Sequence, residues 1–91
     1  YSVSKAALEA LTIAFAKRGA PHNVLVNAIR PGATKTPFHK KIGRKDLSAR
    51  INLIPLKRLA KPSEISNAVL FLAGSKSSFI TNTIINVTGG E

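Results

Sequence analysis

The sequence predicts an α/β protein in which helices alternate with the strands of a parallel sheet. Residues 2–18 and 62–73 place apolar side chains at the three- and four-residue spacing of an amphipathic helix. Residues 24–29 form an apolar, β-branched run without strict alternation, typical of a strand covered on both faces, and residues 83–87 form a second run. Strand, helix and parallel strand make a βαβ unit with a right-handed crossover, which indicates a layered α/β fold.

The opening helix is expected to run from about Ser2 to Arg18. Its apolar side chains form the stripe that we expect to be buried, namely Ala7, Leu8, Leu11, Ala14 and Phe15. Lys17 and Arg18 lie where cations favour the end of a helix, and Gly19 is the candidate cap, with Pro21 just beyond. This pattern predicts that the helix ends near Gly19.

The remaining elements follow from turn residues and periodicity. Residues 30–32, an Arg-Pro-Gly sequence, are expected to stop the first strand. Residues 33–59 are less periodic and predict an excursion with a short helix around residues 46–52. Pro62 and Glu64 suit the first turn of the second long helix, which Gly74 is expected to close. Its predicted stripe consists of Ile65, Ala68, Val69 and Leu72.

The composition restricts the classes of function. The 91 residues include 14 Lys and Arg against 4 Asp and Glu, a net charge of +10, with no cysteine and two histidines. These counts exclude disulfides and argue against a protein-built metal site. The cations are spread over at least three elements and aromatic residues are few, so a basic nucleic-acid-binding module is the weakest alternative. No apolar run approaches the roughly 20 residues of a membrane span, and we expect a cytoplasmic protein with no membrane partner.

The first five residues, YSVSK, place a phenol and an ammonium one helical turn apart. On a helix Tyr1 and Lys5 would share a face, and the cation would stabilise the phenolate. Moving a tyrosine pKa from about 10 towards 7 requires about 4 kcal/mol, so a second cation such as an oxidised nicotinamide ring would help. From the spacing alone, an ordinary surface pair is the alternative.

Four blocks of sequence bear on that alternative: YSVSKAALEALT, VNAIRPGATKTPF, IPLKRLAKPSEISNAVLFLAGSKSSFIT and INVTGG. In order and spacing they resemble the carboxyl half of the short-chain dehydrogenase/reductase family, most like its 3-oxoacyl-[acyl-carrier-protein] reductase-type members. The resemblance implies a doubly wound parallel-sheet Rossmann fold, NAD or NADP as cofactor, and hydride transfer to or from a carbonyl/alcohol substrate. It also implies that residues 1–91 are the carboxyl-terminal part of one such domain. The amino-terminal cofactor-binding half is then missing, and we expect the fragment alone to be inactive.

The resemblance also implies roles for individual residues. Tyr1 matches the acid/base that gives a proton to the carbonyl oxygen or takes one from the alcohol. Lys5 matches the residue that binds the nicotinamide ribose and lowers the pKa of the tyrosine; both would thus also contact the cofactor.

The segment after the first strand matches the family's nicotinamide-binding turn. Pro31 and Gly32 correspond to the PG turn over which the nicotinamide lies, although a plain strand terminator is the alternative. Thr34 and Thr36 correspond to positions that hold the carboxamide through a backbone amide and a hydroxyl, and Thr36, at the PGxxxT position, is the stronger candidate of the two. The alternative is that both are local hydrogen-bonders, as loop threonines usually are. Thr88 departs from the common INVDGG pattern.

Partners are expected from the same resemblance. Six cations follow the turn, namely Lys35, Lys40, Lys41, Arg44, Lys45 and Arg50. They either form a solvated, charged surface or attract an acidic, acyl-carrier-linked substrate. We expect a homodimer or homotetramer whose interfaces use the opening helix, the second long helix with Ile65, Val69 and Leu72, and the terminal strand. We also expect surface positions for His22 and His39. A non-catalytic Rossmann-fold scaffold or nucleotide-binding sensor is the alternative to the enzyme.

Overall fold

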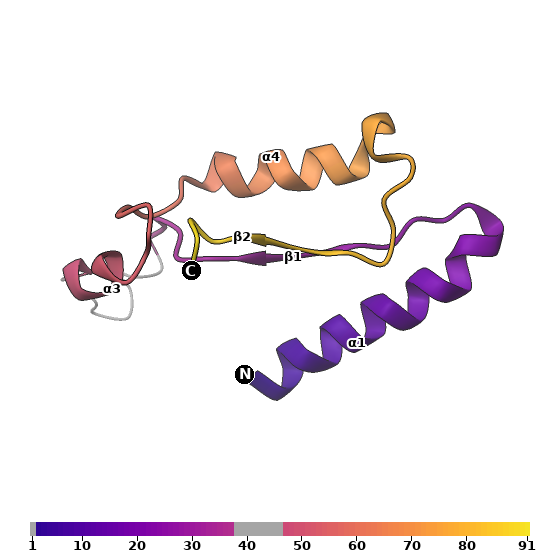
Figure 1. The fold of residues 1–91 in the computed structure, drawn as a ribbon, viewed down its shortest axis with the longest axis horizontal. Helices are drawn as coiled ribbons and strands as arrows, with labels where there is room; N and C mark the ends of the chain where they lie inside the picture. The colour runs from indigo at the N-terminus through magenta and orange to yellow at the C-terminus, as the bar shows by residue number, and fades with distance from the viewer. Residues whose placement is uncertain (1, 38–46) are drawn as a thin grey trace. The chain divides into compact units, whose positions relative to one another are not determined.

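The computed structural model describes residues 2–37 and 47–91; Tyr1 and residues 38–46 lie outside the described residues. The elements, in chain order, are α1 (Ser2–Gly19), the 3-10 turn η1 (Ala20–His22), β1 (Ala28–Pro31), α3 (Ser48–Asn52), α4 (Pro62–Ala73), the 3-10 turn η2 (Ser75–Ser77) and β2 (Ile84–Val87) (Figure 1). This alternation confirms the predicted α/β class. The short helix, the second long helix and the second strand lie where the sequence predicts them.

The described residues form two compact units, each taken by itself. The first comprises residues 2–29 and 69–85, with α1 and η2; the second comprises residues 30–37, 47–68 and 86–91, with α3. Both strands and α4 contribute residues to each unit. None of the described helices is long and apolar enough to cross a membrane.

β1 and β2 pair side by side as parallel strands (Figure 1). The Ala28 N–H donates to the carbonyl of Thr83 at 2.9 Å, and the Gly32 N–H donates to the carbonyl of Val87 at 2.8 Å. The two bonds are four residues apart on both strands and advance in the same direction, so the pairing is parallel and in constant register. The parallel sheet predicted from the sequence is confirmed.

The predicted strand over residues 24–29 begins too early. The Val26 N–H donates to the Thr81 hydroxyl at 3.1 Å, and the Asn27 side-chain amide donates to the carbonyl of Ile80 at 2.9 Å. Side chains therefore take part in these bonds in place of a continuous backbone ladder. An apolar run predicts burial, but it does not show where the ladder starts.

The prediction that residues 30–32 stop the strand is wrong for Arg30 and Pro31, which belong to β1. Pro31 has no N–H to donate. The N–H groups of Ala28 and Gly32 point towards β2, and Pro31 lies an odd number of residues from each of them, so it faces the other way. Its N–H would point away from β2, so no bond between the two strands is lost.

α1 buries a different face from the predicted stripe. Leu8, Leu11 and Phe15 are 55%, 49% and 51% exposed, whereas Thr12 and Ala16 are buried. Periodicity identifies an apolar face, but burial also requires a surface that covers it. Among the described residues nothing buries this face, so the predicted burial of the stripe is wrong for them.

α1 ends at Gly19, as predicted, but its cap differs from the predicted one. Gly19 keeps right-handed helical geometry, and Asn23, after η1, takes the left-handed conformation with a φ of 58°. A Cβ on Gly19 would lie 2.8 Å from the carbonyl oxygen of Val24, which explains the glycine by close approach and not by a left-handed cap.

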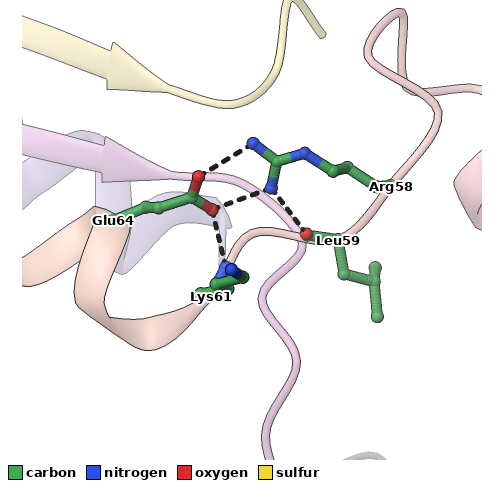
Figure 2. A network of polar contacts seen from close by, with 4 residues as sticks. All are labelled: Arg58, Leu59, Lys61 and Glu64. Carbon is green, nitrogen blue, oxygen red and sulfur yellow. Dashed lines mark hydrogen bonds and ion pairs between the residues drawn. The ribbon is translucent and has the colours of Figure 1, made fainter.

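α4 begins at Pro62, as predicted, and an ion pair stabilises its first turn (Figure 2). The Glu64 Oε2 accepts the Lys61 N–H at 2.8 Å, as in one half of a capping box. The Arg58 guanidinium donates to the two carboxylate oxygens at 2.8 and 2.9 Å, and also to the carbonyl of Leu59 at 3.3 Å. The hydrogen bond from Arg58, then that from the Lys61 N–H, lowers the pKa of Glu64 to about 2.

Gly32 lies where the chain leaves β1. A Cβ on Gly32 would stand 2.8 Å from the Cα of Thr88, closer than real Cβ contacts. Because the neighbouring atom belongs to the backbone, no side-chain rotation could relieve the contact. The glycine therefore allows the turn after β1 to pass close to the chain after β2.

Arg58→Met should raise the pKa of Glu64 from about 2 part of the way towards its usual value of 4.5, since the Lys61 N–H remains. Because the fold favours the ionised form of Glu64, this carboxylate adds to the free energy of unfolding fully above pH 4.5. The contribution is lost as the pH falls towards 2 and the carboxylate is protonated. A carboxyl NMR titration measures the change. Arg50→Met, which breaks the Arg50–Glu91 pair, should leave Glu64 unmoved; an unchanged Glu64 titration in Arg58→Met would contradict the assignment.

Gly32→Ala should lower the free energy of unfolding of the full-length protein by about 2 kcal/mol, as overpacking does. Gly74→Ala is the matched control, because its nearest atom, the carbonyl oxygen of Leu70, would lie at 3.2 Å. Chemical denaturation measures both variants. Equal losses would show that the contact with Thr88 is not the cause.

Candidate functional site

Four of the six predicted site residues lie on one short stretch of the second unit. Pro31 is the last residue of β1, and Gly32, Thr34 and Thr36 follow it. The stretch begins at the carboxyl end of a parallel strand, which is where open α/β sheets bind their ligands.

Ala60 holds the middle of this stretch. The Ala60 N–H donates to the carbonyl of Ala33 at 3.0 Å, and the Lys35 N–H donates to the carbonyl of Ala60 at 2.9 Å. These bonds form an isolated parallel bridge between Thr34 and Ala60. Since successive residues of an extended chain face opposite edges, the N–H and C=O of Thr34 both point away from Ala60. Thr34 thus presents a donor and an acceptor on one side, a pattern that complements a carboxamide.

The two threonines differ in their side chains. The Thr34 hydroxyl donates to the carbonyl of Gly32 at 2.9 Å, so it is used as a local hydrogen-bonder, the role that loop threonines commonly have. Thr34 is half-buried and Thr36 is exposed. The Thr34 hydroxyl is thus bonded within the turn, whereas Thr36 lies at the surface.

Lys5 lies in the first turn of α1, in the first unit, and is exposed. Its predicted partner Tyr1 lies outside the described residues, so the pairing of phenol and ammonium stays a prediction. His22 is exposed in η1, whereas His39 lies outside the described residues.

The predicted basic segment is only partly described. Lys35 is exposed, and Arg50 pairs with Glu91, with Nη2 donating to Oε1 at 2.8 Å. The other four cations, Lys40, Lys41, Arg44 and Lys45, lie outside the described residues. Within residues 2–37 and 47–91, no three His, Cys, Asp or Glu side chains gather as a metal site.

The sequence analysis missed the part played by Arg58, Ala60 and Glu64. Arg58 and Glu64 form an ion pair (Figure 2). The pair flanks the segment that carries Ala60, and Ala60 bonds to the stretch after β1. The signal available was Pro62 followed by Glu64, a helix start with an acid at its third position. An arginine six residues before that acid is not a recognised capping pattern, so the ion pair emerges only from the structure.

Comparisons with known proteins identify similar reductases. The family model described as enoyl-(acyl carrier protein) reductase matches residues 1–91. The 3-oxoacyl-[acyl-carrier-protein] reductase FabG of Thermotoga maritima is 39% identical over 90 residues, which cover 99% of this chain and 37% of the relative. This chain therefore spans little more than a third of that relative's length.

Two solved structures show the same arrangement of elements. A 3-oxoacyl-[acyl-carrier protein] reductase with bound NAD from Brucella melitensis has a TM-score of 0.85 at 31% identity, covering 99% of this chain and 32% of its own. YwfH, an NADPH-dependent reductase involved in bacilysin biosynthesis, has a TM-score of 0.87 at 30% identity, covering 98% of this chain and 38% of its own. The match along the whole chain, together with the turn at the end of β1, shows that the chain belongs to the short-chain dehydrogenase/reductase family.

Proposed function

We propose that this chain is the carboxyl-terminal part of a Rossmann-type domain in an NAD- or NADP-dependent oxidoreductase. The enzyme transfers a hydride between the nicotinamide and a carbonyl/alcohol substrate. The observation that carries this proposal is the extended Thr34 after β1, whose N–H and C=O share one side, in a chain that matches reductases along its whole length.

The residues after β1 fit the nicotinamide end of such a cofactor. A carboxamide carries both a donor and an acceptor, and Thr34 offers the complementary pair from its backbone. The Thr36 hydroxyl is a second polar group two residues on, and Pro31 and Gly32 form the turn that the ring would face. A bound nicotinamide supplies or accepts the hydride, while this chain orients the ring.

Proton transfer falls to the opening residues. Tyr1 gives its hydroxyl proton to the carbonyl oxygen during reduction and takes a proton from the alcohol during oxidation. An ordinary phenol is too weak an acid for rapid exchange at neutral pH, so its phenolate must be stabilised. The Lys5 ammonium supplies a positive charge one helical turn away and a hydrogen bond to the nicotinamide ribose.

The substrate we propose is a small carbonyl or alcohol carried on an acyl carrier. The supporting observation is the Thermotoga maritima relative, which is named for a 3-oxoacyl-[acyl-carrier-protein] substrate. The basic segment after the turn would attract the acidic carrier. The exposed stripe of α1 supports assembly of the complete protein as a homodimer or homotetramer, and we place that protein in the cytoplasm.

Tyr1→Phe in the full-length protein should lower kcat at least about 100-fold, because it removes the proton donor. Binding of the cofactor, measured by fluorescence titration, should change less than about twofold, since the ring of the side chain remains. Turnover retained in this variant would remove Tyr1 from the proposed role. Nucleotide binding without hydride transfer in the unaltered protein would instead favour the non-catalytic sensor.

Two lysines of α1 provide a matched comparison for the same experiment. Lys5→Met should raise the alkaline pKa seen in the pH profile of kcat/KM, because the phenolate loses its neighbouring charge. Lys17→Met makes the same change three turns further along the helix and should leave the profile unchanged.

Replacing Lys40, Lys41 and Arg44 together by serine should raise KM for an acyl-carrier-linked 3-oxoacyl substrate about tenfold, because a screened attraction is lost. The KM for an uncharged ketone should stay the same. Steady-state kinetics at low salt measures both, and equal KM values for the carrier-linked substrate before and after replacement would contradict a carrier role for the segment.

A further inference from the structure

We propose that Arg58 and Glu64 are positioning residues for the nicotinamide end of the cofactor site, and that they act through the backbone of Ala60. The proposal rests on the function proposed above. Neither side chain touches the reacting atoms; the pair sets where Thr34 lies.

The ion pair closes a short loop of chain. Arg58 donates to both carboxylate oxygens of Glu64, and the same carboxylate accepts the N–H of Lys61 (Figure 2). A third bond runs from the guanidinium to the carbonyl of Leu59. Residues 58–61 are therefore fixed at both ends to the first turn of α4. We call Arg58, Glu64 and these bonds the clamp.

The clamp is linked to the site by two backbone bonds. Ala60 lies inside the clamped loop and bonds on either side of Thr34, to Ala33 at 3.0 Å and to Lys35 at 2.9 Å. A shift of Ala60 must therefore shift Thr34 or break one of these bonds. Because a hydrogen bond weakens steeply with distance and angle, a small displacement of Thr34 would cost its contact with a carboxamide.

Side-chain packing beside the clamp is incomplete. A cavity of about 130 Å³ is bordered by Ala33, Ala60, Arg58 and Glu64. The two alanines have only methyl groups to offer, and space remains beside them. Leu56 and Val87 also line the cavity without filling it, so the polar bonds contribute to the separation between residues 33–35 and the clamped loop.

A second ion pair of the same chemistry lies in the same unit without this connection. Arg50 pairs with Glu91, which ties α3 to the segment after β2. No described hydrogen bond of either residue reaches residues 33–35. The Arg50–Glu91 pair is therefore a matched control for loss of an exposed ion pair as such.

The test compares two ligands in the full-length protein. Arg58→Met should weaken binding of the preferred dinucleotide, NAD or NADP, about fivefold, the size expected for a strained hydrogen-bonded contact. Binding of ADP-ribose, or of its 2′-phosphate if NADP is preferred, should not change, because these probes lack the nicotinamide. Hydrogen exchange at the Ala60 and Lys35 amides should become faster. If the role of Arg58 were purely structural, Arg58→Met would weaken the binding of both ligands to the same extent.

Two further variants keep the test decisive. Glu64→Gln retains one oxygen for the Lys61 N–H, removes the charge and replaces the second acceptor oxygen by an NH2 donor, and it should reproduce the loss. The double variant should lose no more than Arg58→Met alone. Arg50→Met should bind both ligands normally.

Unchanged dinucleotide binding in Arg58→Met, or equal losses for both ligands, would overturn the positioning role while leaving the proposed function intact. Failure of both clamp variants to fold, with Arg50→Met folded, would assign the pair to folding and also overturn it. An unaltered protein that binds neither dinucleotide would overturn the proposed function itself.

Discussion

The proposed site depends on two backbone hydrogen bonds: the Ala60 N–H donates to the Ala33 carbonyl, and the Lys35 N–H donates to the Ala60 carbonyl. The pairing of β1 with β2 ends at the bond from Gly32 to Val87, and from there the chain needs a new partner to stay extended. Ala60 supplies it, so strand geometry continues beyond the sheet. Without this bridge, the N–H and C=O of Thr34 would have no fixed common direction, and the turn after β1 would be an ordinary loop.

The ion pairs of the second unit restrict the positions of the segments that they join more than they raise the free energy of unfolding. The chain carries only four acids against 14 basic residues, yet two of those acids, Glu64 and Glu91, pair with arginines that join separate segments. Exposed ion pairs of this kind contribute little to the free energy of unfolding, because water and salt screen them. A bidentate pair nevertheless restricts geometry, since the planar guanidinium meets both carboxylate oxygens in one orientation. This restriction is what the clamp transmits to Ala60.

The sequence predicted local features better than contacts between distant segments. Pro62, Glu64 and Gly74 correctly bracketed α4, because caps and breakers act within a few residues. The start of β1 was misplaced, because Val26 and Asn27 take partners some 55 residues away, and composition does not reveal them. The stripe of α1 was correctly located as apolar and wrongly taken as buried. The turn residues Pro31, Gly32, Thr34 and Thr36 were predicted from the family resemblance, whereas only the structure shows the bridge to Ala60.

Two sides of α1 carry different side chains: one carries Lys5, and the other carries the apolar stripe. Lys5, Thr12 and Ala16 are spaced by seven and four residues and so lie along one line of the helix, whereas Leu8, Leu11 and Phe15 lie to one side of it. Thr12 and Ala16, the small residues on that line, are buried among the described residues, while the apolar side chains are about half exposed. A surface that covers the apolar side would therefore fix the orientation of the helix without occupying the line that carries Lys5. The helix can therefore bury its apolar stripe and still place the proposed proton-transfer pair.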